Sequence, residues 1–208
     1  MSYIKKPMDI EKRSFEIIGE EMGPHNFDDR ELSIIKRVIH TTADFEYKDI
    51  IYIREGAIDS ALETLKQGVT IYTDTKMALS GINKKALEQL GCKVICYVSE
   101  PDVAAIAKER GITRSMAGVE KAVEDGAQIF VFGNAPTALF RLKELMEEGK
   151  AHPSFVVAAP IGFVGAAESK EEFETVNMPM ITIRGRKGGS TVAASIMNAL
   201  MYMIVKRD

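Results

Sequence analysis

The chain has 208 residues, of which 46% are hydrophobic and 27% are charged, and its formal net charge is −3. This length fits one domain, 1–208, with a substantial core, and the composition excludes a disordered or membrane-embedded chain. Without a basic excess, nucleic acid is not an expected partner, whereas a local basic pocket for a small polyanion remains open.

Cys92 and Cys96 stand in C-x3-C spacing within an expected strand, with no further cysteine in the chain to complete a metal site. We therefore expect reduced thiols in a cytoplasmic protein and no metal site. The N-terminal residues lack the apolar run of a signal peptide. The apolar run Thr191–Val205 is short for a membrane span and fits a helix that is buried or at a subunit interface.

In chain order, a first helix is expected at 9–20 and a second from Asp28 or Asp29 to His40, with Glu31 near the capping-box position. From residue 50 onward, apolar β-type runs alternate with helical patterns. The expected strands are 50–53, 69–72, 93–97, 128–132, 154–159 and 179–183.

Signals for helix starts fall between these strands. Asn83 is expected to cap a helix 84–90, and Ser99 a helix with Pro101 in its first turn. Ser169 and Glu172 have the spacing of a capping box.

Six strands that alternate with helices predict an α/β fold, a three-layer α/β/α sandwich whose sheet is mostly parallel and covered on both faces. In such sheets ligands bind beyond the carboxyl ends of the strands. We call this side of the sheet the carboxyl edge. Four loops are expected on it: 73–77, 133–137, 160–167 and 184–190.

Arg37 and His40 lie one turn apart on the polar flank of the second helix. An imidazole can give or take a proton near neutral pH, and a guanidinium can hold a carboxylate by two hydrogen bonds. The alternative is structural, because a histidine in the last turn of a helix also satisfies free carbonyls and the helix dipole. From the residues alone, the structural interpretation is favoured.

Three segments could bind anions. The loop 133–137 opens a helix, so its amides and the dipole favour an anion, although a tight turn explains it equally well and the chain has no nucleotide fingerprint. The loop 184–190 carries three cations and is the strongest anion signal, with solvated charge as the alternative. Arg114 stands at a helix start, where the dipole disfavours a cation, so an acidic partner or ligand is expected.

The loop 160–167 is apolar although it occupies a connection between elements. Two glycines, Gly162 and Gly165, flank Phe163 and Val164 and permit a close backbone approach. A flat hydrophobic ligand or a second subunit would cover these side chains, and packing of the loop on the core is the alternative. With the histidine and the arginines, this pattern suits proton-assisted rearrangement of a large molecule that carries several carboxylates.

Several segments that run from the first helix to the last closely resemble the precorrin-8X methylmutase family of cobalamin biosynthesis, in the same order. They are Arg13-Ser14-Phe15, Arg37-Val38-Ile39-His40, 134–140, 160–170, and Arg184-Gly185-Arg186 with Gly188-Gly189-Ser190. The resemblance covers essentially the whole chain. Only 41–45 departs from it, being more polar than in some relatives, which affects the floor of the pocket.

The resemblance implies a cytoplasmic isomerase without a cofactor that moves a methyl group from C-11 to C-12 of a corrin precursor. The product is hydrogenobyrinate, or cobyrinate when cobalt is already in the substrate. His40 is implied as the catalytic acid/base that protonates the macrocycle for a 1,5-sigmatropic shift, and Ser14, Arg37 and Arg114 as substrate contacts. The implied partners are precorrin-8X or cobalt-precorrin-8, with a slight preference for the latter, and a second copy in a homodimer whose pocket lies near the subunit interface.

Further positions are our own extension of the resemblance. We expect Asn134 and Thr137 to face a side-chain carboxylate of the substrate. The ring face should lie against Gly162, Phe163 and Gly165, and Arg184 and Arg186 should clamp anionic groups.

Two rival functions remain open at this point. A carrier that binds a corrinoid without changing it would need the arginines and the glycine loops but not His40. A nucleotide-dependent α/β enzyme is suggested by the fold class alone, and the missing phosphate fingerprints count against it.

Overall fold

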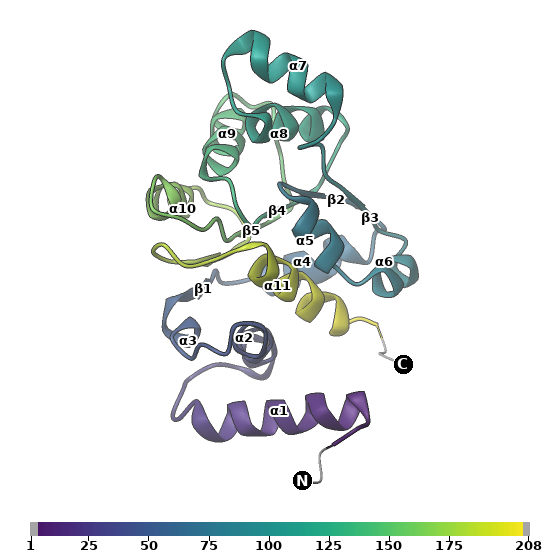
Figure 1. Cartoon of the computed structure of the whole chain (residues 1–208), viewed down its shortest axis with the longest axis vertical. Helices are drawn as coiled ribbons and strands as arrows, with labels where there is room; N and C mark the ends of the chain where they lie inside the picture. Colours follow the sequence, from purple (N-terminus) through teal and green to yellow (C-terminus); the bar gives the residue numbers. More distant parts are fainter. Residues whose placement is uncertain (1–3, 206–208) are drawn as a thin grey trace.

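The computed structural model describes residues 4–205 and is built on one six-stranded sheet (Figure 1). The spatial order of the strands is β1-β6-β5-β4-β2-β3. All neighbours are parallel except β1, which joins β6 antiparallel at one side. The strands are β1 (Ile51–Ile53), β2 (Thr70–Thr73), β3 (Lys93–Ile95), β4 (Ile129–Phe132), β5 (Phe155–Ala158) and β6 (Met180–Ile183).

Alternate side chains of the central strands enter two separate cores, because successive residues of a strand face opposite sides of the sheet. Ile129 and Val131 of β4 pack in one core, and Phe130 and Phe132 pack in the other. Both faces are therefore covered by helices, which confirms the predicted α/β/α arrangement.

One face of the sheet carries four helices directly and three more behind them (Figure 1). The helix α11 lies between the sheet and α2, and α1 packs on the outer side of α2. These helices are α4 (Ala57–Leu65), α5 (Lys76–Gly81), α6 (Lys84–Leu90), α11 (Ser190–Tyr202), α2 (Asp29–Thr42), α3 (Tyr47–Ile50) and α1 (Pro7–Glu21).

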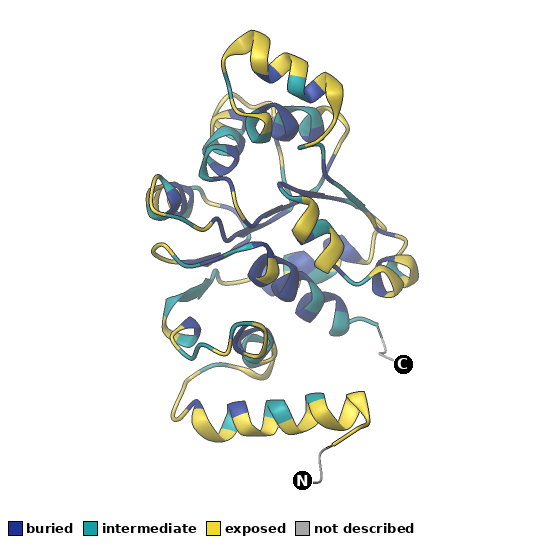
Figure 2. Cartoon of the chain, viewed as in Figure 1, coloured by how far each residue is buried: buried dark blue, intermediate teal, exposed yellow. Residues whose placement is uncertain are grey.

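The opposite face is covered by α8, α9 and α10, with α7 packed outside α8. Figure 2 shows α7 and α1 as largely exposed helices at opposite ends of the molecule. These helices are α7 (Pro101–Arg110), α8 (Arg114–Glu124), α9 (Pro136–Glu147) and α10 (Ala166–Glu174). None of the described helices combines the length and the apolar character that crossing a membrane requires.

The apolar composition of the run that begins at Thr191 is explained by the buried position of α11. Ten of its residues are buried, and α2, α5 and the sheet surround it. Of the two expectations, burial is the one that the structure supports, and the composition of this helix needs no subunit interface.

The predicted caps agree with the structure at α2 and fail at α7 and α10. Asp28 and Glu31 form the expected capping box. The helix α7 has Glu100 at its N-cap, with no side-chain cap. The expected capping box of Ser169 is wrong, because α10 begins earlier, after Gly165 in a left-handed conformation, and the Ser169 hydroxyl donates to the carbonyl of Ala166 inside the helix.

The four loops of the carboxyl edge lie together, as the parallel strands require. The hydroxyls of Thr75 and Ser190 are 2.7 Å apart, and the N–H of Gly189 donates to the carbonyl of Ala159 at 2.9 Å. The approach is tightest at Gly188, whose φ is 155° and where an added Cβ would lie 2.3 Å from the Ala159 carbonyl oxygen. Only glycine permits this contact.

We expect Gly188→Ala to destabilise the protein by about 3 kcal/mol or more, because backbone strain and a steric clash coincide. Gly185→Ala is the matched control, since Gly185 also has a positive φ, 73°, but nothing within 4 Å of an added Cβ. The control should lose only about 1 kcal/mol. Chemical denaturation measures both losses, and equal losses would contradict the close approach at Gly188.

Candidate functional site

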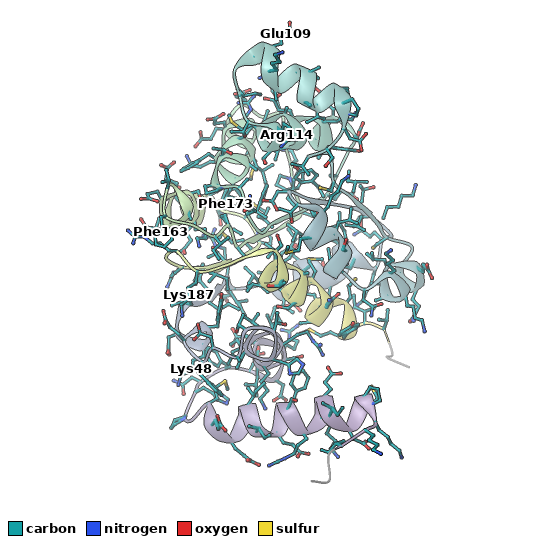
Figure 3. The ribbon with its side chains drawn as sticks, in the orientation of Figure 1. Lys48, Glu109, Arg114, Phe163, Phe173 and Lys187 are labelled. Carbon is teal, nitrogen blue, oxygen red and sulfur yellow. The ribbon has the colours of Figure 1, made fainter. Side chains whose placement is uncertain are left out.

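The residues predicted for the site lie in three groups around the carboxyl edge. Figure 3 shows Phe163 and Lys187 along one side of the molecule and Arg114 on α8, away from α1 and α2. The first group comes from α1 and α2, the second from the starts of α8 and α9, and the third from the loops after β5 and β6.

His40 is exposed in the last turn of α2, and its imidazole packs edge-on against Phe15 of α1, with ring centroids 5.3 Å apart. Other groups satisfy the carbonyls of this turn: the hydroxyls of Thr41 and Thr42 and the N–H of Ala43 donate to them at 2.7–2.9 Å. The helix end is thus completed without the imidazole. His40 is therefore not needed to satisfy the free carbonyls at the end of α2, which was the main reason for a purely structural role.

Two hollows are lined by neighbours of His40. A groove of about 430 Å³ beside α1 is lined in part by Phe15, which also contacts the imidazole. A smaller hollow of about 220 Å³, lined in part by Thr41 and Met77, lies where α2 meets α5 and α11. His40 is exposed and has a residue that lines a hollow on each of two neighbouring elements, Phe15 in α1 and Thr41 in α2.

Arg37 has a charged partner in the structure. Its guanidinium lies 3.0 Å from the carboxylate of Glu11, over the rings of Phe15 and Tyr202, and its side chain is 15% exposed. Arg37 thus links α2 to α1 and α11, and it shares Phe15 with His40 as a neighbour. Ser14, also in α1, donates its hydroxyl to the carbonyl of Ile10 at 2.9 Å.

The second group forms where the starts of α8 and α9 meet. The hydroxyls of Thr113 and Thr137 are 3.1 Å apart, and Thr113 also caps α8 by accepting from the N–H of Met116. Arg114 and Asn134 are exposed beside this contact. The start of α8 and the guanidinium of Arg114 favour an anionic group here.

Three amides of the loop 133–137 already donate to an acceptor within the protein, which favours the tight turn, the other of the two interpretations of this loop. The carboxylate of Asp74, which is 1% exposed, accepts hydrogen bonds from the N–H groups of Gly133, Asn134 and Ala135 at 2.7–2.9 Å. Burial raises the pKa of Asp74, and the three hydrogen bonds oppose that rise. The anion that this loop binds is part of the protein itself.

The third group contains the most exposed apolar side chains of this edge. Phe163 is 83% and Val164 91% exposed, and the guanidinium of Arg186 lies over the Phe163 ring at 5.6 Å. Arg184 makes a bidentate ion pair with Glu174 and stacks on a tyrosine ring. Among the described residues Arg186 has no carboxylate partner, so it is the more available of the two arginines.

Contacts between the groups join them into one edge. Lys187 pairs with Asp44 and Glu46, just after α2, which connects the loop after β6 to the His40 end of that helix. An added Cβ at Gly165 would lie 3.4 Å from Pro136, which places the loop after β5 against the start of α9. The three groups are continuous along the carboxyl edge.

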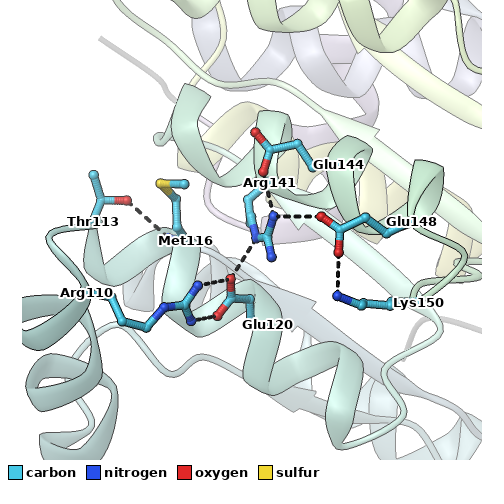
Figure 4. A network of polar contacts seen from close by, with 8 residues as sticks. All are labelled: Arg110, Thr113, Met116, Glu120, Arg141, Glu144, Glu148 and Lys150. Carbon is cyan, nitrogen blue, oxygen red and sulfur yellow. Dashed lines mark hydrogen bonds and ion pairs between the residues drawn. The ribbon is translucent and has the colours of Figure 1, made fainter.

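A separate charge cluster lies on the outer side of α8 and α9 (Figure 4). Glu120 accepts from Arg110 and Arg141, and Arg141 also contacts Glu144. The cluster joins α7, α8 and α9. Since each arginine in it already has a carboxylate partner, it offers no free cation to a ligand.

Two buried residues at the carboxyl edge were not identified as functional from the sequence. Asp74 directly follows an apolar strand, which is a recognisable signal for a residue at this edge. Lys170 was part of the resemblance, but no local pattern shows that its side chain is buried.

A mostly parallel α/β sheet with an exposed histidine, cations and exposed apolar groups at its carboxyl edge is the arrangement of an α/β protein with a site for an anionic small molecule. The model of the precorrin-8X methylmutase family matches residues 9–203. The chain belongs to the precorrin-8X methylmutase family. It is thus an isomerase that moves a methyl group within one molecule, which excludes the carrier and the nucleotide-dependent enzyme.

Relatives and solved structures agree over nearly the full length. Cobalt-precorrin-8 methylmutase of Salmonella typhimurium is 49% identical over 97% of this chain and 98% of its own. Precorrin-8X methylmutase of Pseudomonas aeruginosa is 36% identical over 96% and 97%. The structure of precorrin-8X methylmutase from Thermus thermophilus superposes with a TM-score of 0.88 at 38% identity, covering 94% of this chain and 95% of that one.

We expect Asp74→Asn to destabilise the protein by about 2–4 kcal/mol, because the amide of asparagine would oppose one of the three N–H groups inside the protein. Asp125→Asn is the control: Asp125 accepts from the hydroxyl of Tyr97 at an exposed position, and its loss should cost less than about 1 kcal/mol. Urea unfolding at neutral pH compares the two. Similar losses would show that the Asp74 carboxylate does not organise the loop.

Proposed function

We propose that this methylmutase acts on cobalt-precorrin-8 and moves the methyl group from C-11 to C-12 of the corrin precursor, giving cobyrinate. The relatives from Salmonella typhimurium and Leptospira interrogans, at 49% and 42% identity, carry the name cobalt-precorrin-8 methylmutase. The Pseudomonas aeruginosa relative, named for the cobalt-free substrate, is less similar at 36%. The cobalt-free substrate, precorrin-8X, which would give hydrogenobyrinate, is the second candidate.

The observation that carries the mechanism is an exposed imidazole that the helix end does not use. In the proposed reaction His40 donates a proton to the macrocycle, the methyl group migrates, and a proton is then removed to restore the conjugated ring. The imidazole ends in its starting protonation state, as general acid and base catalysis requires. Since an isomerisation moves no net electrons, we propose that no cofactor takes part and that cobalt belongs to the substrate.

The remaining residues are proposed to bind the periphery of the substrate. Arg114, Asn134 and Thr137 would hold one side-chain carboxylate where α8 and α9 begin. Arg186, with Arg184 beside it, would hold another. The three groups lie at different places along the carboxyl edge, which suits a macrocycle whose carboxylates point outward in several directions.

The other substrate contacts lie closer to the ring itself. Phe163, between Gly162 and Gly165, would cover the ring face and in turn be shielded from water. Ser14 and Arg37 would complete the His40 end of the pocket. Because Arg37 is paired with Glu11, a substrate carboxylate would share or replace that partner.

We propose that the protein works as a homodimer in the cytoplasm. Met8, Ile10 and Ile17 of α1 leave apolar side chains exposed, Met8 of them at the groove beside Phe15, and exposed apolar side chains on one helix suit a second copy. Closed two-fold dimers are the commonest assembly. The two buried free thiols, Cys92 and Cys96, fit a reducing compartment.

We expect His40→Asn to lower turnover of cobalt-precorrin-8 by about 10²–10⁴-fold, because the proton donor is lost, while substrate affinity changes little. An anaerobic absorbance assay follows formation of the corrin chromophore, and spectral titration measures binding. His152→Asn, at an exposed position outside the three groups, is the control and should keep full activity. Unchanged turnover in the His40 variant would refute the role of the imidazole.

Running the same assay with precorrin-8X tests the choice of substrate. Faster conversion of the cobalt-free compound would overturn the assignment of cobalt-precorrin-8 while keeping the methyl shift. Binding of both compounds without conversion by the wild type would refute the proposed reaction.

We expect sedimentation equilibrium to give twice the mass of one chain, and Met8→Lys with Ile10→Lys to shift it toward the monomer, because charges oppose apolar burial. Ile106→Lys, an exposed apolar position on α7, is the control. A monomer in the wild type would refute the dimer, and a dimer that survives the double substitution would place its interface elsewhere.

A further inference from the structure

Lys170 of α10 is a lysine with 0% exposure and has no acidic partner among the described residues. Its Nζ donates to two backbone carbonyls, that of Pro160 at 3.0 Å and that of Lys187 at 2.8 Å. Burying an ammonium is unfavourable unless other groups compensate it. Burial lowers the pKa of Lys170 to about 8, which leaves the group mostly charged at pH 7.

The two carbonyls belong to different loops of the carboxyl edge. Pro160 begins the loop that carries Phe163, and Lys187 lies in the loop that carries Arg186. The loops also share two backbone contacts, from the N–H of Gly162 to the carbonyl of Arg186 at 3.2 Å and from Gly189 to Ala159 at 2.9 Å. The Lys170 ammonium is thus a side-chain link between the loops, placed beneath them.

The helix that carries Lys170 is itself firmly held. Phe173, one turn further along, is fully buried in the core. Arg54 donates to the carbonyls of Glu174 and Val176 at the end of the helix, and Arg184 pairs with the Glu174 carboxylate. The backbone that carries Lys170 is therefore held by contacts other than those that its Nζ makes with the loops.

We infer that Lys170 is the positioning residue that keeps the loops 160–165 and 184–189 together, so that Phe163 and Arg186 stay side by side at the carboxyl edge. An unbranched apolar side chain such as methionine would fill the same space without the cost of a buried charge. The lysine instead supplies donors to two backbone carbonyls, that of Pro160 in a buried contact and that of Lys187 in a partly buried one. Its role is indirect, since its side chain lies below the loops and is closed off from the surface.

The effect on catalysis rests on the proposed function, because it assumes that Phe163 and Arg186 contact the substrate. The effect on the loops does not rest on the proposed function, and it is measured separately. Loosening the loops should weaken substrate binding and leave proton transfer at His40 unchanged. Substituting a residue that only supports overall stability would not speed hydrogen exchange in these two loops alone. It would also not raise KM while leaving kcat unchanged.

The experiment compares Lys170→Met with Lys48→Met in the full-length protein. Lys48 makes the same type of contact, from Nζ to the carbonyl of Met22 at 2.8 Å, but lies at α3 near the end of α1 (Figure 3). In the Lys170 variant KM for cobalt-precorrin-8 should rise about tenfold, the worth of one hydrogen bond from a charged group, with kcat within about threefold. Lys48→Met should change neither constant.

Hydrogen exchange read by mass spectrometry gives the second result. Peptides that span 160–165 and 184–189 should exchange faster in the Lys170 variant, and those from β4 and α11 should not. Unchanged exchange in the two loops, or a KM equal to that of the wild type, would overturn the inference. If the wild type shows no turnover, the proposed function fails, and exchange alone decides the role of Lys170.

Lys170→Gln carries the test if the methionine variant does not fold. A glutamine amide is one bond shorter than the lysine side chain, so it keeps N–H donors but reaches at most one of the two carbonyls. The same direction of change is expected, a raised KM and faster exchange in both loops. A glutamine variant that matches the wild type in both measurements would overturn the inference.

Discussion

The carboxyl edge depends on one constraint: backbone N–H and C=O groups that leave the strands are buried there and need partners. Two ionisable side chains of opposite sign provide them. The carboxylate of Asp74 accepts from three N–H groups of one loop, and the ammonium of Lys170 donates to the carbonyls of two others. Within residues 4–205 neither charge has an opposite charge as its partner, so backbone dipoles compensate both. The conformation of the loops thus depends on two buried side chains.

The same edge is joined to the core through the start of α11. Gly133 and Ser190 approach so closely that an added Cβ at Gly133 would lie 2.5 Å from the Ser190 Cα, and Gly188 lies as close to the end of β5. From Ser190 onward α11 is buried between the sheet and α2, and α2 ends beside His40. The position of the proposed acid therefore follows from core packing, whereas the proposed binding loops follow from polar backbone contacts.

Local sequence patterns predicted the six strands, the four loops of the edge and helices such as 84–90 and 114–124, because hydrophobic period and caps are written in neighbouring residues. Contacts between distant residues were beyond those patterns. Glu11 pairs with Arg37 and Glu174 with Arg184, so two cations expected to be available for a ligand are engaged within the protein. The antiparallel placement of β1 and the burial of Lys170 depend in the same way on the completed fold.

The polar segment after His40 is explained by the end of α2. Thr41 and Thr42 return their hydroxyls to carbonyls of the last turn, and Ala43, in a left-handed conformation, closes the helix with its N–H. A left-handed residue other than glycine costs about 1 kcal/mol, and such strain is concentrated at functional sites. These groups satisfy the free carbonyls that a histidine at a helix end often satisfies. The imidazole is thereby left exposed beside Phe15, and exposure is what the proposed proton transfer requires.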